Sequence, residues 1–190
     1  YQTYDSLPLI PFDPTSTSFG LTFFANNRII NTDDLYFKPN QYNGPRQVSG
    51  EQPENLSMRL YVDASDSTFN QSSYIEFLYT IKADNYMIGF DINFVGMEPY
   101  LEKGTNYVDL NWKTDMLQLE KSVDRFNGPT IYYKFFEDEV DYLSETKDDE
   151  DELVTRVKWV SFKQRFFSST LIANDYFLNA NVKTWEKENP

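Results

Sequence analysis

Carboxylates are the most abundant reactive side chains in this 190-residue chain, which holds 30 Asp and Glu residues. A pair of carboxylates can hydrolyse a glycosidic bond, one as acid and the other as base or nucleophile. No spacing in the sequence singles out such a pair. The chain has no His and no Cys, which removes the usual base near neutral pH, Ser-His and Cys-His nucleophiles, and imidazole or thiolate zinc sites. We therefore predict no catalytic residue, no cofactor and a protein that is not an enzyme.

The densest group of carboxylates lies at residues 148–152, where five acidic residues follow one another. Such a run could offer oxygen ligands to calcium, but it lacks the Asp-x-Asp-x-Asp-Gly spacing that orients them. Like charges in a row repel one another and are solvated. The sequence therefore predicts an acidic loop over residues 147–152 and no metal site.

Aromatic residues, 17% of the chain, are the second candidates for binding. Tyr132, Tyr133, Phe135 and Phe136 could form an aromatic platform for a sugar or for an extended apolar peptide. Adjacent aromatic residues on a strand are more often core on one face and ordinary cover on the other. Both interpretations stay open for Tyr132 and Tyr133, our candidate contact residues. The same choice applies to Trp159, Phe162, Phe166 and Phe167.

Alternation of apolar and polar residues predicts that these side chains are carried by strands. It is strict at 56–63 and 75–81, and it recurs at 86–94. Residues 157–173 give strand, polar break at 163–165, and strand, because their β-branched residues and serines disfavour one continuous helix. We predict further strands at 19–24, 28–31 after an Asn-Asn turn, 108–112, 131–136 and 140–143, with 116–125 either a strand or a short helix.

Length and composition limit the fold and the partners. The sequence predicts one all-β domain over residues 1–190, a sandwich of roughly nine to eleven strands with few or no helices. Residues 38–54, rich in Pro, Gly, Asn and Gln, are expected to form a long loop. A formal charge of −13 disfavours nucleic acid and anionic headgroups as partners. No run of 18 apolar residues is present, and a chain that begins with Tyr is expected to be a fragment of a longer protein.

Several motifs in order resemble one known family. The pattern Trp-Val-x-Phe-Lys-x-x-Phe-Phe from Trp159 to Phe167, followed by Leu-Ile, resembles the closing signature of the large periplasmic domain of YidC-type (OxaA/YidC) membrane protein insertases. The segments 1–9, 19–28, 131–134 and 142–145 resemble the same domain in the same order. Its signature residues here are Trp159, Phe162, Lys163, Phe166 and Phe167, and we expect their role to be structural.

The resemblance implies a β-supersandwich of two large antiparallel sheets, similar to galactose mutarotase-like proteins. It also implies a position on the periplasmic side of a Gram-negative inner membrane and a part in membrane protein insertion and folding without catalysis. The implied partners are nascent membrane proteins and the accessory subunits of the Sec translocon, with scaffolding of the membrane helices as a third role. Membrane attachment would lie in helices absent from this chain.

Two further expectations follow. We expect the family's first and last strands to be absent from this chain, so that exposed sheet edges could pair artificially between copies of the fragment. A carbohydrate-binding β-sandwich from a secreted glycan-processing system is the alternative function. An exposed aromatic pair beside a polar cleft would favour that alternative, and a buried pair would remove its support.

Overall fold

The computed structural model describes residues 12–41, 44–62, 70–116 and 128–185. Within these ranges the predicted all-β class is confirmed: the structure has thirteen strands, and its only helical element there is a short 3-10 turn, η1 (Thr32–Asp34). No helix in the described ranges has the length and apolarity needed to cross a membrane. The chain divides into two compact units. The N-terminal unit is Ser18–Trp112, and the C-terminal unit combines Lys113–Pro190 with Tyr1–Thr17. We retain the single domain as a proposal, with these two units inside it.

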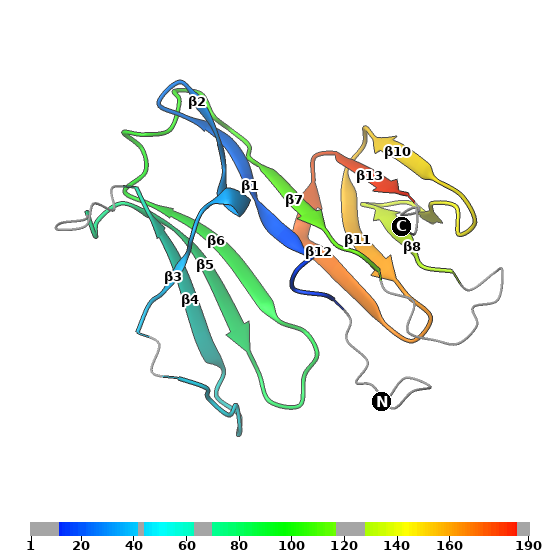
Figure 1. Cartoon of the computed structure of the whole chain (residues 1–190), viewed down its shortest axis with the longest axis horizontal. Helices are drawn as coiled ribbons and strands as arrows, with labels where there is room; N and C mark the ends of the chain where they lie inside the picture. Colours follow the sequence, from blue (N-terminus) through cyan, green and yellow to red (C-terminus); the bar gives the residue numbers. More distant parts are fainter. Residues whose placement is uncertain (1–11, 42–43, 63–69, 117–127, 186–190) are drawn as a thin grey trace. The chain divides into compact units, whose positions relative to one another are not determined.

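The N-terminal unit begins with a tight hairpin of β1 (Ser18–Ala25) and β2 (Arg28–Asn31). Asn26 and Asn27 form its turn with φ values of 50° and 61°, as predicted from their tolerance of left-handed backbone. With β7 (Asp109–Lys113) these strands form a sheet of order β2-β1-β7 (Figure 1).

A second antiparallel sheet of the same unit has the order β3-β4-β5-β6. Its strands are β3 (Lys38–Pro39), β4 (Glu54–Tyr61), β5 (Tyr74–Ile81) and β6 (Gly89–Val95). One core cluster joins β1 to β5, which makes the unit a β-sandwich. Its buried members are Leu21, Phe23, Ala25, Ile75, Phe77 and Met97. Met58 and Leu60 pack against the same cluster, so the alternation in β4 and β5 correctly identified the inner face.

The C-terminal unit contains a sheet of order β12-β11-β8-β9 and a two-stranded sheet β10-β13. The larger sheet is built from β8 (Thr130–Phe135), β9 (Val140–Tyr142), β11 (Val157–Lys163) and β12 (Ser168–Phe177). The smaller pairs β10 (Asp149–Leu153) with β13 (Ala180–Thr184). The predicted strand, break and strand of residues 157–173 are confirmed as β11 and β12.

The acidic loop predicted over residues 147–152 is wrong for most of its length, because Asp149 begins β10. Each of the first three side chains of β10 has a partner outside the run. Asp149 accepts a hydrogen bond from the Ser144 N–H, Glu150 forms an ion pair with Lys183, and Asp151 accepts from Tyr133. These hydrogen bonds and the ion pair offset the repulsion between the acidic side chains of the run.

Two other boundaries differ from the prediction. The loop expected at 38–54 is irregular from 40 to 53 in its described part, but Lys38 and Pro39 pair with β4 as an edge strand. The strand expected from Tyr86 begins only at Gly89, and residues 86–88 lie exposed in the β5–β6 loop. Most of the ambiguous segment 116–125 and the first family segment, 1–9, lie outside the described residues.

Candidate functional site

The signature residues lie in β11 and in the turn after it, and they do not converge on one surface. Phe162 is buried, Trp159 and Phe167 are half-buried, and Phe166 is 63% exposed at the turn. The turn is closed by a 2.8 Å hydrogen bond from the Gln164 N–H to the Phe167 carbonyl. This scatter between core and surface supports the structural role that we propose for the signature.

Lys163 is the signature residue with the most specific contacts. Its ammonium donates to Glu145 Oε1 at 2.9 Å and to the Gly128 carbonyl at 3.2 Å. The side chains of Lys163 and Glu145 are only 26% and 13% exposed. The end of β11 is thereby attached to the segment that follows β9 and to the residue pair that precedes β8. A cation held by these two partners acts as a structural tie.

The two candidate contact tyrosines lie on opposite faces of β8. Tyr133 is 2% exposed, and its hydroxyl donates to Asp151 Oδ2 at 2.7 Å, which links β8 to β10. Burial, and then the hydrogen bond to Asp151 and its charge, raise the pKa of Tyr133 well above its ordinary value. Tyr132 is half-buried and stacks on Tyr142 of β9, with ring centroids 4.9 Å apart. Tyr132 and Tyr133 therefore cannot form one platform.

A buried carboxylate that the sequence interpretation missed lies on the outer face of the second sheet. Glu76 accepts hydrogen bonds from Ser57 Oγ at 2.6 Å, Arg59 Nε at 3.0 Å and Asn93 Nδ2 at 3.1 Å. Desolvation alone would raise the pKa of Glu76, but these hydrogen bonds and the Arg59 charge outweigh it and lower the pKa. The signal was available, because Arg59 and Glu76 are direct cross-strand partners once β4 and β5 are paired in register.

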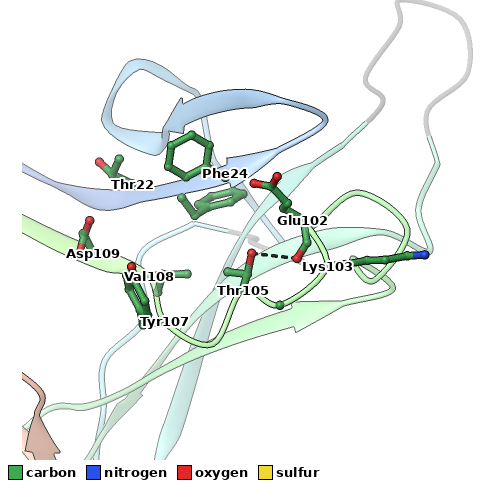
Figure 2. A pocket seen from close by; sticks show the side chains of 10 residues that line it. Thr22, Phe24, Glu102, Lys103, Thr105, Tyr107, Val108 and Asp109 are labelled. Atoms are coloured by element: carbon green, nitrogen blue, oxygen red, sulfur yellow. Dashed lines mark hydrogen bonds between the residues drawn. The ribbon is translucent and has the colours of Figure 1, made fainter.

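A pocket of about 300 Å³ opens beside β1 in the N-terminal unit, between residues 22–24 and the segment 102–109 that leads into β7 (Figure 2). Phe24 and Tyr107 supply exposed aromatic rings to its wall and Glu102 supplies a carboxylate, whereas the Lys103 side chain points away from it (Figure 2). Thr105 Oγ1 donates to the Glu102 carbonyl at 2.9 Å, which helps to shape the loop. This mixture of aromatic surface and charge can accept an apolar side chain.

The pocket continues into an exposed apolar surface on the first hairpin. Ile29 is the cross-strand partner of Phe24, and both side chains are more than half exposed. We call Phe24, Ile29 and Tyr107, with the pocket between Phe24 and Tyr107, the β1 apolar surface. The sequence predicts strands at Phe24 and Ile29 but does not reveal this surface. The apolar residues on both sides of the Asn-Asn turn were the available signal.

The described residues contain no group of three or more Asp or Glu side chains placed to hold a metal ion. Lys183 and Glu150 form an exposed ion pair, which raises the pKa of Lys183. The arrangement of the charged residues described above is thus one of structural pairs, and the apolar surface is the feature suited to contact with another molecule.

Comparison with known proteins identifies the family. The family model described as "YidC periplasmic domain" matches residues 11–189. The membrane protein insertase YidC of Parabacteroides distasonis is 38% identical over 181 residues, which are 93% of this chain and 26% of that protein. The corresponding proteins of Bacteroides fragilis and Phocaeicola vulgatus are 34% and 32% identical, each over 185 residues covering 97% and 96% of this chain and 27% of each relative.

The chain thus spans about a quarter of the length of the curated relatives it matches. No solved structure gives a significant match to it. The order of motifs seen in the sequence and the match over nearly the whole chain agree. The chain belongs to the YidC periplasmic domain family.

Proposed function

We propose that this chain is a non-enzymatic contact module of a membrane protein insertase, placed on the periplasmic side of the bacterial inner membrane. The observation that carries the proposal is the family match over residues 11–189, together with relatives that are named membrane protein insertases. The carbohydrate-binding alternative is not supported, because Tyr133 is buried and the relatives are insertases.

The β1 apolar surface is the proposed contact region. Nascent membrane proteins present apolar side chains before they enter the bilayer, and the pocket between Phe24 and Tyr107 is large enough to receive such a side chain. Accessory subunits of the Sec translocon are the second proposed partner of this module. Both partners would use exposed aromatic anchors, which dominate the energy of protein interfaces.

A role without catalysis is consistent with the state of the ionisable side chains. The chain lacks His and Cys, so proton transfer near neutral pH would fall to carboxylates or lysines. The most enclosed of these described above, Glu76, Glu145 and Lys163, are committed to internal hydrogen bonds and ion pairs. Tyr133 has a raised pKa and keeps its hydroxyl proton, which it donates in a hydrogen bond to Asp151.

The test is a heteronuclear NMR titration of the chain with an apolar peptide, with periplasmic domains of the translocon and with a panel of glycans. The peptide carries uncharged polar flanks, because the charge of −13 would attract cationic flanks without specificity. We expect saturable shifts around Phe24 and Tyr107 with peptide or translocon domains, and none with glycans.

A matched pair of variants locates the contact. Replacing Phe24 and Tyr107 together by Ser should weaken binding by about tenfold to a hundredfold, because each exposed aromatic anchor contributes up to about tenfold. Leu178→Ser removes a side chain of similar exposure from the C-terminal unit and should leave binding unchanged. Equal loss in both variants, or no saturable shift with any protein partner, would overturn the proposed contact region.

A further inference from the structure

The β5–β6 loop carries three consecutive apolar residues that no part of the protein covers. Tyr86, Met87 and Ile88 are 105%, 61% and 57% exposed. Single exposed apolar residues are normal on protein surfaces, whereas an uninterrupted group marks a contact site. Figure 1 shows this loop projecting beyond the ends of β5 and β6. We call residues 86–88 the apolar tip.

The backbone that presents the apolar tip is held by specific contacts. Asn85 Oδ1 accepts a 2.8 Å hydrogen bond from the Met87 N–H, and Asp84 occupies the left-handed region with φ of 53°. Thr80 and Gly89 form the last pair of the β5–β6 ladder. A side chain at Gly89 would crowd Thr80, since an added Cβ would lie 3.2 Å from the Thr80 Cβ. These contacts therefore restrain the backbone on both sides of the apolar tip.

The form and size of the apolar tip indicate what it contacts. It is a projection and does not line the pocket beside β1, whereas peptides and small ligands bind in grooves and clefts. Three side chains also offer less than the roughly 800 Å² that each partner buries in a stable protein interface. A lipid bilayer needs no complementary groove and accepts a small apolar projection.

The residue types and the local charge agree with a bilayer interface. Tyrosine is enriched at membrane interfaces, where its ring meets lipid and its hydroxyl stays hydrated. Lys82 and Asp84 beside the tip carry opposite charges, and Glu54, the cross-strand partner of Ile81, is paired with Arg46. The net charge of −13 disfavours contact with anionic headgroups. These features select a zwitterionic surface.

We propose that the apolar tip, Tyr86 to Ile88, inserts into the interfacial region of a zwitterionic phospholipid bilayer. The inference rests on the proposed function only because an insertase module is attached beside a membrane. Contact at the tip would fix the orientation of the N-terminal unit toward the lipid surface. It is separate from the β1 apolar surface, so either contact can fail without the other.

The experiment uses the full 190-residue chain attached through an added C-terminal His tag to vesicles of phosphatidylcholine with a nickel-chelating lipid. Attachment raises the effective concentration, so that a weak contact becomes measurable. Met87→Trp places a fluorescent reporter in the tip, and lipids brominated along the acyl chain quench it on contact. Its emission is read as the difference from the unsubstituted chain, which contains Trp112, Trp159 and Trp185. Tyr36→Trp is the matched reporter, because Tyr36 is 93% exposed near β3, which pairs with the part of β4 far from this loop.

We expect a blue shift and bromolipid quenching for Met87→Trp, and neither for Tyr36→Trp. When the untethered chain partitions onto vesicles, replacing residues 86–88 together by Ser should lower the partition coefficient more than about tenfold. Burial of even one such side chain contributes roughly that factor. Tyr36→Ser should leave the partition coefficient unchanged.

Equal quenching of both reporters, or quenching of neither, would overturn the proposal. So would a tip that responds to the soluble apolar peptide and not to vesicles, which would make it a peptide contact. Circular dichroism of each variant checks that the β-structure is intact. The peptide titration of the β1 apolar surface reports separately on the proposed function.

Discussion

Removal of the Lys163 ammonium should destabilise the C-terminal unit, because its two partners would lose their donor. Lys163→Met keeps much of the aliphatic stem and deletes the contacts to Glu145 Oε1 and the Gly128 carbonyl. An exposed ion pair is worth up to about 1 kcal/mol, and breaking a buried pair costs about 3 to 5 kcal/mol. With side chains 26% and 13% exposed, this pair lies between the two cases, and we expect a loss of about 2 kcal/mol.

The assay is urea unfolding followed by tryptophan emission in a Trp112→Phe background. Emission then comes from Trp159 and Trp185, which both belong to the C-terminal unit. A double-mutant cycle with Glu145→Gln isolates the pair and should give a coupling of about 1 to 2 kcal/mol. Lys183→Met, which removes an exposed ion pair, is the control and should leave the midpoint unchanged. A coupling below about 0.5 kcal/mol at an unchanged denaturant slope would refute the structural tie.

Three further predictions concern other sites. Glu76 has a lowered pKa in the folded state, so the stability it contributes is present above its ordinary pKa of 4.5 and is lost as pH falls through the folded pKa. When urea midpoints are measured against pH, Glu76→Gln should reduce the loss of stability at acid pH. Tyr133 has a raised folded pKa, so its contribution is complete below pH 10 and is lost at higher pH; Tyr133→Phe should remove that alkaline dependence. Gly96 has φ of 60°, and an added Cβ would collide with the Ser72 carbonyl, so Gly96→Ala should cost about 2 kcal/mol or more in urea unfolding, whereas Gly104→Ala, with open space around it, should cost about 1 kcal/mol.

Much of the sandwich could be predicted from sequence because its strands have one buried face. In β4 and β5, every second residue faces the core, so the period of two reports burial directly. The same pattern failed at Tyr86 and Ile88, because alternation reports residue types and not the end of a ladder. β5 ends at Ile81, and Thr80 already pairs with Gly89. Only Ile81 of β5 remains opposite the segment before Gly89, so residues 86 and 87 have no strand opposite them to extend the sheet.

The candidate surfaces were harder to predict, because they depend on pairing between segments distant in sequence. The sequence indicates Tyr132 as a possible contact residue, but its stacking partner Tyr142 follows only from the β8–β9 register. The three donors around Glu76 come from two neighbouring strands, β4 and β6. A single sequence gives residue types along one strand, whereas these sites are formed across strands.

The acidic strand β10 shows why a run of like charges is an ambiguous signal in an acidic chain. Successive side chains of a strand point to opposite faces, so the repulsion within the run is smaller than the sequence suggests. The compensating groups, Ser144, Tyr133 and Lys183, come from three other segments. Among the described strands, β10 pairs only with β13, and carboxylates along such an edge oppose the addition of another strand. The charge that argued for a loop is thus equally suited to protecting a sheet edge, and only the position of the donors distinguishes the two.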